Sequence, residues 1–351
     1  MTTNPSAAAP DFRRIGDEPP FHVSVRGRPF LAGSGHTGFP ESIRDAGGMI
    51  PVLETEQANV PLPELVASVR RVLDDELSAS GGVVLRGLPI TGKPAFESLL
   101  AQLGYPSHGY RGGIAVRKRD PGLALEASSE DHRITLSPHN EMAYLPAYPR
   151  RIFFFCDVAA RQGGEVPVND IREAVKGIPA DVLKEFRERG IRYHRSLPQV
   201  SSDHEMGWVD TFGTDDRARV EEHMTASGYD YTWTNSGGLR YSYRWSAFVP
   251  HPDTGEELWF NQVTELHCSY WRAHPGFRPD LPDEDYPATT TYGDGTAIDG
   301  DLISFLRGAL WRTTRAVRMR KGDVLVLDNQ VLQHGRFAYE GTRRHFVGLA
   351  R

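Results

Sequence analysis

A short apolar strand that leads into a histidine-containing segment stands out in the stretch 322–336, Gly322-Asp323-Val324-Leu325-Val326-Leu327-Asp328-Asn329-Gln330-Val331-Leu332-Gln333-His334-Gly335-Arg336. The apolar run 324–327 predicts a buried strand, and His334 is expected on the following loop or at a barrel rim. Further short strands are predicted at 83–88, 152–155, 314–319, 323–328 and 345–350. Because these strands do not alternate strictly with helices, an antiparallel barrel or jelly roll decorated with helices is favoured over a doubly wound sheet.

Apolar residues at helical spacing predict several amphipathic helices between these strands. In the first, Leu65, Val69, Leu73 and Leu77 recur every four residues and therefore share one helical face. The predicted helices cover 64–78, 96–103, 181–189, 215–226 and 302–310. The turn-rich stretch 228–262 carries alternating aromatic residues, which predicts a half-buried sheet.

The length and composition limit the class of protein. We expect residues 1–20 to form a flexible N-terminus and residues 21–351 a single domain. With 46 acidic and 40 basic residues and a net charge of -6, nucleic-acid binding is not expected. Two cysteines exclude a disulfide scaffold and a Cys-rich zinc site. No apolar run approaches the ~18 residues of a membrane span and no signal peptide is evident, so a cytoplasmic location is expected.

A second notable stretch is Ser137-Pro138-His139-Asn140-Glu141. Residues i and i+2 of an extended segment point the same way, so His139 and Glu141 could present an imidazole and a carboxylate to one metal ion. With His334 they would form a 2-His-1-carboxylate set, which occupies one face of Fe(II) and leaves three positions open. The chain has 13 histidines. A hydrogen-bonded surface loop therefore remains an alternative, as do His251 or His267 as the third ligand.

The order of the sequence motifs provides a further clue. Arg344 follows His334 on the closing strand, where its planar guanidinium group could bind a dicarboxylate. This order resembles the Fe(II)/2-oxoglutarate oxygenases of the taurine dioxygenase (TauD/TfdA) superfamily, and within it the clavaminate-synthase-like and SyrP-like branch. The matching stretches are Gly82-Val83-Val84-Leu85-Arg86-Gly87, His139-Asn140-Glu141-Met142-Ala143-Tyr144, Gly163-Gly164-Glu165-Val166-Pro167-Val168-Asn169-Asp170, Trp259-Phe260-Asn261-Gln262, Tyr292-Gly293-Asp294-Gly295, Gly322-Asp323-Val324-Leu325 and His334-Gly335-Arg336.

The resemblance implies a double-stranded β-helix (jelly-roll) core with iron at one mouth, held by His139, Glu141 and His334. Arg344 would pair with the distal carboxylate of 2-oxoglutarate, and Arg343 is the less favoured candidate. The family usually has a threonine where this chain has Val166, so another group would have to supply its hydrogen bond to 2-oxoglutarate. Halogenating members replace the carboxylate ligand, so the presence of Glu141 disfavours halogenation.

The implied reaction uses Fe(II), 2-oxoglutarate and O2 to hydroxylate an unactivated C–H bond, with release of succinate and carbon dioxide. The branch implies an amino acid or amino-acid-derived substrate in specialised metabolism, such as antibiotic biosynthesis. Asn140, Tyr144, Arg336 and Arg111 are the candidate substrate residues. Tyr144 could instead pack in the core, and Arg336 could instead fix its own loop through backbone carbonyls.

Three other functions remain open from the sequence. The substrate could be an aminoacyl group tethered to an acidic carrier protein that docks on the basic loop 111–119, although this loop could equally be solvated. The chain could be a jelly-roll protein that binds metal without turnover. A zinc hydrolase ranks last, because no His-Glu-x-x-His motif is present. A homo-oligomer is compatible with all of these functions.

Overall fold

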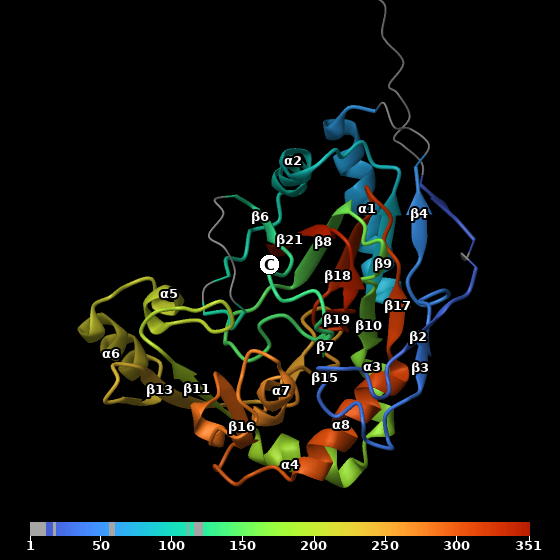
Figure 1. The fold of residues 1–351 in the computed structure, drawn as a ribbon. Helices are drawn as coiled ribbons and strands as arrows, with labels where there is room; N and C mark the ends of the chain where they lie inside the picture. Colours follow the sequence, from blue (N-terminus) through green and yellow to red (C-terminus); the bar gives the residue numbers. More distant parts are fainter. Residues whose placement is uncertain (1–11, 17–18, 56–59, 111, 116–121) are drawn as a thin grey trace, which may run out of the picture.

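The computed structural model of the chain describes residues 12–16, 19–55, 60–110, 112–115 and 122–351 (Figure 1). The fold is mainly β, with helices around the strands. Two sheets form its centre, and a third sheet lies to one side of them.

The larger central sheet has seven strands in the order β1-β4-β5-β18-β8-β21-β6. Its neighbouring strands are antiparallel except for β4 and β5, which are parallel. These strands are β1 (Arg13–Arg14), β4 (Val52–Glu54), β5 (Gly82–Arg86), β18 (Val324–Asp328), β8 (Arg151–Val158), β21 (Arg344–Ala350) and β6 (Ala124–Glu126). Arg13 and Arg14, which lie in the segment 1–20, pair with β4, and the flexibility of that segment stays a prediction.

The smaller central sheet is antiparallel, in the order β17-β10-β19-β7. Its strands are β17 (Arg315–Val317), β10 (Val166–Asp170), β19 (Leu332–Arg336) and β7 (Leu136–His139). The chain passes back and forth between the sheets, since β7 is followed by β8, and β17, β18, β19 and β21 alternate between the two.

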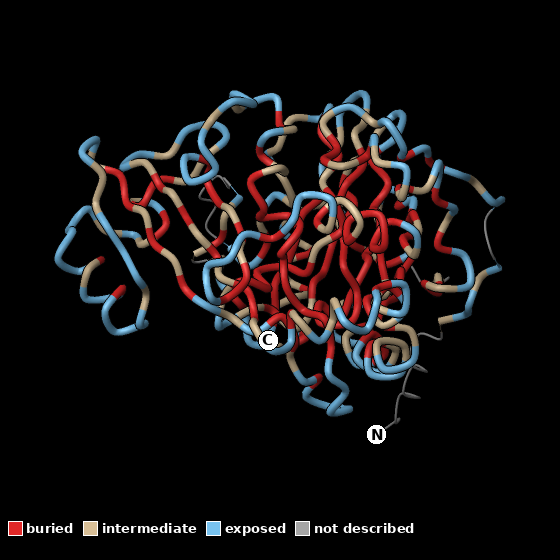
Figure 2. Tube along the Cα trace, turned by 90° about the horizontal axis from the view of Figure 1, so that it is seen from below, coloured by how far each residue is buried: buried red, intermediate tan, exposed pale blue. Residues whose placement is uncertain are grey.

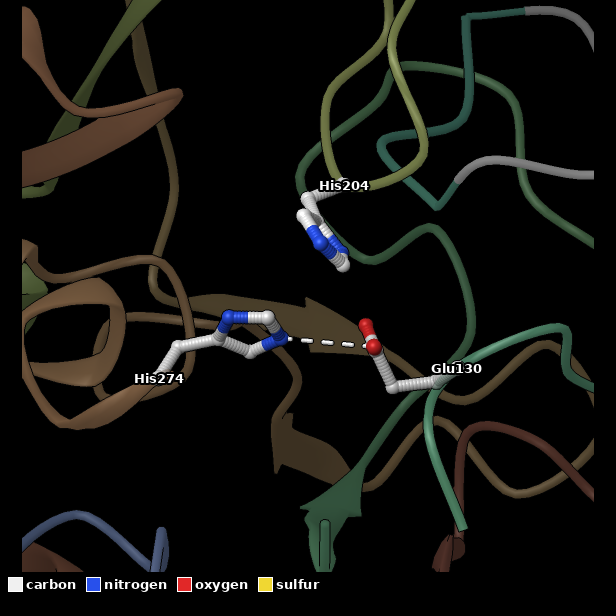
Figure 3. Close-up of side chains that lie close together, drawn as sticks. All are labelled: Glu130, His204 and His274. Atoms are coloured by element: carbon white, nitrogen blue, oxygen red, sulfur yellow. Dashed lines mark ion pairs between the residues drawn. The ribbon is translucent and has the colours of Figure 1, made fainter. Parts of the chain in front are cut away.

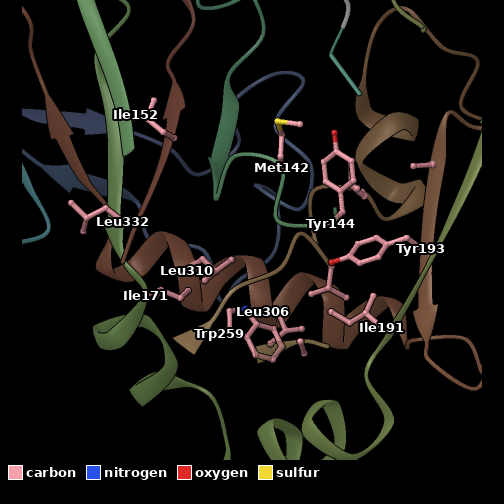
Figure 4. Packing of buried hydrophobic residues seen from close by; sticks show 14 of the residues in the cluster. Met142, Tyr144, Ile152, Ile171, Ile191, Tyr193, Trp259, Leu306, Leu310 and Leu332 are labelled. Carbon is pink, nitrogen blue, oxygen red and sulfur yellow. The ribbon is translucent and has the colours of Figure 1, made fainter. Parts of the chain in front are cut away.

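Side chains from both sheets meet in one apolar cluster (Figure 4). Ile152 comes from the larger sheet and Leu332 from the smaller one. Strand β18 is buried on both faces, because successive side chains of a strand point to opposite sides. Its Leu325 and Leu327 join this inner cluster, whereas Val324 and Val326 belong to an outer cluster.

Two helices contribute to that outer cluster, α1 (Leu62–Ser80) and α2 (Lys93–Leu103). Leu65, Val69 and Leu73 of α1 are fully buried there, so the helix and the face predicted from the four-residue spacing are confirmed. Arg86 and Asp323 form a buried ion pair between β5 and the turn before β18.

The third sheet has the order β12-β13-β11-β16 and projects to the left of the centre in Figure 1. Its elements are β11 (Ile191–Leu197), β12 (Asp230–Trp233), β13 (Leu239–Trp245) and β16 (Ala288–Tyr292), with α5 (Trp208–Phe212) and α6 (Arg217–Ala226) beside them. The half-buried aromatic sheet predicted within 228–262 is therefore confirmed. Burial is concentrated in the central strands, and the projecting part is more exposed (Figure 2).

The remaining elements connect these sheets. Helix α8 (Gly300–Thr313) packs beside β10 and confirms the helix predicted at 302–310. The others are β2 (His22–Ser24), β3 (Ser42–Arg44), β9 (Gln162–Gly163), β20 (Tyr339–Glu340), β14 (Phe248–Pro250), β15 (Glu257–Trp259), α3 (Ile171–Ala174), α4 (Ala180–Arg189), α7 (Cys268–Ala273), and the 3-10 helices η1 (Val175–Gly177) and η2 (Asp283–Asp285).

Candidate active site

His139, Glu141 and His334 lie together on the smaller sheet. The register of β7 and β19 places His139 directly opposite His334, with their ring centroids 4.6 Å apart. Glu141 follows β7, and its Oε2 lies 3.6 Å from Nε2 of His334. One ligand atom from each residue lies within 4.8 Å of the others. His334 belongs to a strand and not to a loop, which corrects one of its two predicted locations.

The imidazole of His139 is oriented by its own strand. Nδ1 lies 2.8 Å from the carbonyl oxygen of Ser137. A carbonyl only accepts hydrogen bonds, so Nδ1 carries the proton and Nε2 keeps its lone pair. Burial, followed by the neighbouring His334, lowers the pKa of His139. The ring is therefore a neutral imidazole at neutral pH, the form that binds a metal ion.

The backbone of Glu141 is held by the side chain of Asn329, a residue to which the sequence pattern assigned no role. Oδ1 of Asn329 accepts from the Glu141 amide at 2.7 Å, and its Nδ2 donates to the Glu141 carbonyl at 2.9 Å. Nδ2 also donates to the carbonyl of Pro149 at 2.8 Å. Met142, the next residue, has a φ of 57°, which is unusual for a residue other than glycine. The Asn329 hydrogen bonds stabilise this turn and thereby fix where the carboxylate lies.

The geometry of the three side chains fits a bound divalent iron. Two imidazoles and one carboxylate point their lone pairs toward one position, and this arrangement is favourable when a cation binds there. Two histidines and one carboxylate are also the donor set of non-haem Fe(II) centres with open coordination positions. His251 and His267, the alternative third ligands, lie elsewhere: His251 pairs with Asp328, and His267 is the N-cap of α7.

The three residues line one pocket, which Arg343 also lines. Arg344 is not among its lining residues; its side chain is 51% exposed and contacts Asp157. The structure therefore places Arg343, the candidate less favoured from the sequence, at the pocket, and which of the two arginines binds 2-oxoglutarate stays to be tested. The register of β21 against β8 shifts between Arg344 and His345, and simple strand alternation could not predict this shift.

Arg343 is fixed within the pocket by two contacts. Its Nε donates to the carbonyl of Gly164 at 3.1 Å, and its Nη2 donates to Nδ1 of His345 at 2.9 Å. A Cβ on Gly164 would lie 3.0 Å from Cδ of Arg343, so the glycine leaves room for this side chain. Burial lowers the pKa of Arg343 to about 10, and the group therefore stays cationic at neutral pH.

Apolar residues line the same pocket as Arg343. They are Leu136, Phe154 and Val166. Val166 lies on β10 and is only 2% exposed, so it replaces the hydroxyl of the family's threonine with a buried methyl group. The ring of Phe154 lies 5.0 Å from that of His334, between centroids. A cation with apolar neighbours interacts strongly with an anion, because little water screens the pair.

The candidate substrate residues have different locations. Tyr144 lines the pocket, and its hydroxyl accepts from the amide of Ile114 at 2.7 Å. Asn140 is fully buried outside the pocket lining, and its Nδ2 donates to the carbonyl of Asn329; that it contacts substrate stays a prediction. Arg336 lines the pocket and also donates to the carbonyls of three loop residues. Arg111, together with Arg117, Lys118 and Arg119, lies outside the described residues.

Further polar residues of the pocket were missed from the sequence. Gln262 lines it and donates from Nε2 to the Asn140 carbonyl at 2.6 Å. The motif Trp259-Phe260-Asn261-Gln262 could have indicated this residue. Glu265 also lines the pocket, and burial raises its pKa. No sequence pattern marked Glu265, because it lies outside every motif.

Comparison with known proteins agrees with this geometry. The family model described as "Taurine catabolism dioxygenase TauD, TfdA family" matches residues 43–350. The chain is 28% identical over 279 residues to the dapdiamide synthesis protein DdaC of Enterobacter agglomerans, which covers 79% of this chain and 84% of that protein. It is 26% identical over 315 residues to a clavaminate synthase-like protein of Arabidopsis thaliana, with 86% and 93% covered. The solved structure of PvcB from Pseudomonas aeruginosa matches with a TM-score of 0.47 and 15% identity, over 96% of this chain and 92% of that one.

The family model, matched over residues 43–350, identifies a non-haem iron oxygenase. The chain belongs to the TauD/TfdA dioxygenase family, and it is a dioxygenase that uses Fe(II) and 2-oxoglutarate. No helix among the described residues is long and apolar enough to cross a membrane.

Proposed function

We propose that His139, Glu141 and His334 hold the iron and that Arg343 binds the distal carboxylate of 2-oxoglutarate. The enzyme then hydroxylates an unactivated C–H bond of an amino acid or amino-acid-derived intermediate in specialised metabolism. The observation that carries this proposal is the convergence of the three ligand atoms in a pocket that also contains a half-buried arginine, Arg343.

The residues of the chain have distinct tasks in this proposal. The bound iron and 2-oxoglutarate supply the oxidising chemistry, with succinate and carbon dioxide as by-products. The guanidinium group of Arg343 is charged, and its N–H donors match the two oxygens of a carboxylate. The contacts with Gly164 and His345 hold this group in place before the co-substrate binds. Asn329 keeps Glu141 in place through its backbone. Phe154 and Val166 exclude water from the inner pocket.

The double-stranded β-helix is the finer description of the fold that we propose. The chain alternates between the two central sheets, and apolar side chains of both sheets meet between them. Eight-stranded jelly rolls have this organisation. The pocket with the three ligands lies on the smaller sheet, where β7 and β19 pair.

The proposed substrate class rests on sequence similarity to known proteins. DdaC, a relative over most of this chain, is named as a dapdiamide synthesis protein. A biosynthetic substrate derived from amino acids is therefore favoured here. Membership of a dioxygenase family favours turnover over metal binding alone. A carrier-tethered substrate stays a prediction, because the basic loop that would dock the carrier lies outside the described residues.

Anaerobic titration with Fe(II) and then 2-oxoglutarate tests the proposal. We expect one iron per chain and a weak visible charge-transfer band when 2-oxoglutarate chelates the metal. His139→Ala and His334→Ala should each lose the iron and the band. His22→Ala, at an exposed position on β2, is the matched control and should keep both.

Glu141→Ala should likewise weaken iron binding and abolish hydroxylation. Circular dichroism and thermal unfolding separate loss of the metal from loss of the fold. Full iron affinity in any of the three ligand variants would remove that residue from the centre. The absence of the band in the folded wild-type protein would contradict the proposed function as a whole.

A further inference from the structure

A second group of polar side chains lies at the same pocket, formed by Glu130, His204 and His274 (Figure 3). Glu130 comes from the loop between β6 and β7, His204 from the loop between β11 and α5, and His274 from the end of α7. Glu130 and His204 line the pocket that holds the iron ligands. His204 is exposed, so this group lies where the pocket meets solvent.

The Glu130 carboxylate is held from two sides. Nε2 of His274 lies 3.3 Å from Oε1 of Glu130, and the backbone amide of Asp131 donates to the same oxygen at 3.0 Å. Burial alone would raise the pKa of Glu130, but the His274 contact and the Asp131 hydrogen bond lower it below its ordinary value. Glu130 is therefore an ionised carboxylate at neutral pH, although it is partly buried.

The tautomer of His274 argues against a second metal ion at this group. The backbone amide of Gly276 donates to Nδ1 of His274 at 3.0 Å. Nδ1 therefore holds the lone pair, and the ring proton lies on Nε2, the atom that faces Glu130. A metal ion would need the lone pair of that same Nε2. The arrangement instead points Nε2 of His274 at the carboxylate, 3.3 Å from Oε1 of Glu130.

The backbone of the Glu130 loop is also fixed. Arg336, two residues after His334 on β19, donates from Nη1 to the carbonyl of Glu130 at 2.9 Å. Its Nη2 donates to the carbonyls of Asp131 and Ile134. The strand that carries an iron ligand therefore also carries the residue that positions Glu130. On the opposite side, a Cβ on Gly276 would lie 2.7 Å from the His204 ring, so the glycine allows the two histidine rings to approach.

Two basic residues lie near the charge of Glu130: His274 contacts its carboxylate, and Arg336 also lowers its pKa. Within the described parts of the chain, no lysine or arginine side chain forms an ion pair with its carboxylate. Asp203 lines the same pocket and adds negative charge. Arg343 supplies positive charge to this pocket, and the proposed function assigns it to 2-oxoglutarate. The pocket thus offers separate positions for an anion and for a cation.

We propose that Glu130 binds a cationic nitrogen of the substrate, a primary ammonium or a guanidinium group, with His274 and Arg336 as its positioning residues. This inference rests on the proposed function and narrows its substrate class to cationic compounds. The half-buried carboxylate of Glu130 forms no ion pair with a lysine or arginine among the described residues, so it gains a charge-assisted hydrogen bond when such a nitrogen binds. The C–H bond to be oxidised would then lie on the part of the substrate that extends toward His139 and His334.

The test uses pairs of ligands that have the same shape and differ in one cationic nitrogen. Suitable probes are L-lysine with 6-hydroxynorleucine, L-arginine with L-citrulline, and L-leucine with 2-hydroxyisocaproate. Each is titrated anaerobically into the full chain loaded with Fe(II) and 2-oxoglutarate. Calorimetry gives the dissociation constant, and the fluorescence of Trp271, which lines the pocket, gives a second reading.

We expect the cationic member of at least one pair to bind roughly ten- to a hundredfold more tightly, in line with a charge-assisted contact. Glu130→Gln keeps the shape and removes the charge, so it should reduce this preference to about twofold or less. His274→Gln should give an intermediate loss. Glu188→Gln, on the exposed face of α4, is the matched control and should bind as the wild-type protein does.

The outcomes separate this inference from the proposed function. If the charge-transfer band forms but no pair favours the cation, or if the preference survives Glu130→Gln, the cation subsite is wrong and the dioxygenase assignment stands. If the band does not form, the proposed function itself fails. Metal analysis adds a third outcome: a second equivalent of divalent metal that disappears in Glu130→Gln would replace the cation subsite with a metal site.

Discussion

Arg343 and Arg344 are consecutive residues with different surroundings: Arg343 lines the pocket of the iron ligands, whereas Arg344 contacts Asp157 and is half exposed. The two residues therefore form a matched pair for testing where 2-oxoglutarate binds. Arg343 immediately precedes β21 and Arg344 begins it, and both carry the same guanidinium group, so any difference between their variants reports location and not chemistry.

Arg343→Gln should raise the half-saturating concentration of 2-oxoglutarate by roughly ten- to a hundredfold. It removes a charge-assisted contact worth about 1.5–3 kcal/mol, and each 1.4 kcal/mol is a factor of about ten. Iron affinity should change little. Arg343→Lys should rescue the defect only in part, because a point charge does not reproduce the fork. The measurement is the titration of the charge-transfer band. Arg344→Gln is the control, and a defect confined to it would restore the assignment made from sequence.

Val166→Thr should tighten 2-oxoglutarate binding by about two- to tenfold, the equivalent of one hydrogen bond of about 0.5–1.5 kcal/mol. Val166 lines the pocket and is nearly isosteric with threonine, so the hydroxyl replaces a methyl group without a change of volume. Binding is measured by the same titration, and thermal unfolding without 2-oxoglutarate reports any cost to the fold. Weaker binding in a stable variant would show that an apolar contact at this position matters more than the hydroxyl.

The elements with a regular or continuous pattern of apolar residues could be predicted from the sequence. Helix α1 follows from the spacing of Leu65, Val69 and Leu73, because a regular apolar stripe needs no partner to be recognised. The strand β18 follows from its continuous apolar run. His139 and Glu141 were found because neighbours two apart in an extended chain share a face. These inferences rest on local geometry alone.

The parts of the site that depend on distant partners could not be predicted in this way. Strand β19 contains buried polar residues, and Oε1 of Gln333 accepts from Nδ2 of Asn169, 164 residues away in the chain. The inward orientation of Arg343 depends on an irregular register against β8. Glu130 becomes part of a site only because loops from three distant segments meet there. Each of these features requires tertiary pairing that no local pattern encodes.

The stability of the protein should fall on acidification, in part through His267. Burial lowers the pKa of His267 to about 4, whereas a histidine in the unfolded chain titrates near 6.5. Between these values unfolding takes up a proton, so the free energy of unfolding falls as the pH falls, by up to about 1.4 kcal/mol per pH unit. His267→Asn keeps an N-cap acceptor for the amide of Ser269 but cannot titrate. The free energy of unfolding, measured with urea at pH values between 7 and 4, should therefore depend less steeply on pH in this variant. His22→Asn, at an exposed position, serves as the control, and equal slopes for His267→Asn and the wild-type protein would contradict the prediction.

Asn329 should affect the iron centre although it is not a ligand. Asn329→Ala removes its hydrogen bonds to the amide and carbonyl of Glu141 and to the carbonyl of Pro149. Losing this buried network should cost about 2–5 kcal/mol of unfolding free energy. It should also weaken iron binding, because the carboxylate is no longer held where the two imidazoles converge.

Asn261→Ala is the matched control: Asn261 is equally buried, but its side chain bonds to the backbone of Ala247 and Val263. We expect both variants to be less stable in urea and only Asn329→Ala to lose iron affinity in a metal-competition assay. Equal iron affinity in the two folded variants would mean that Glu141 finds its position without Asn329.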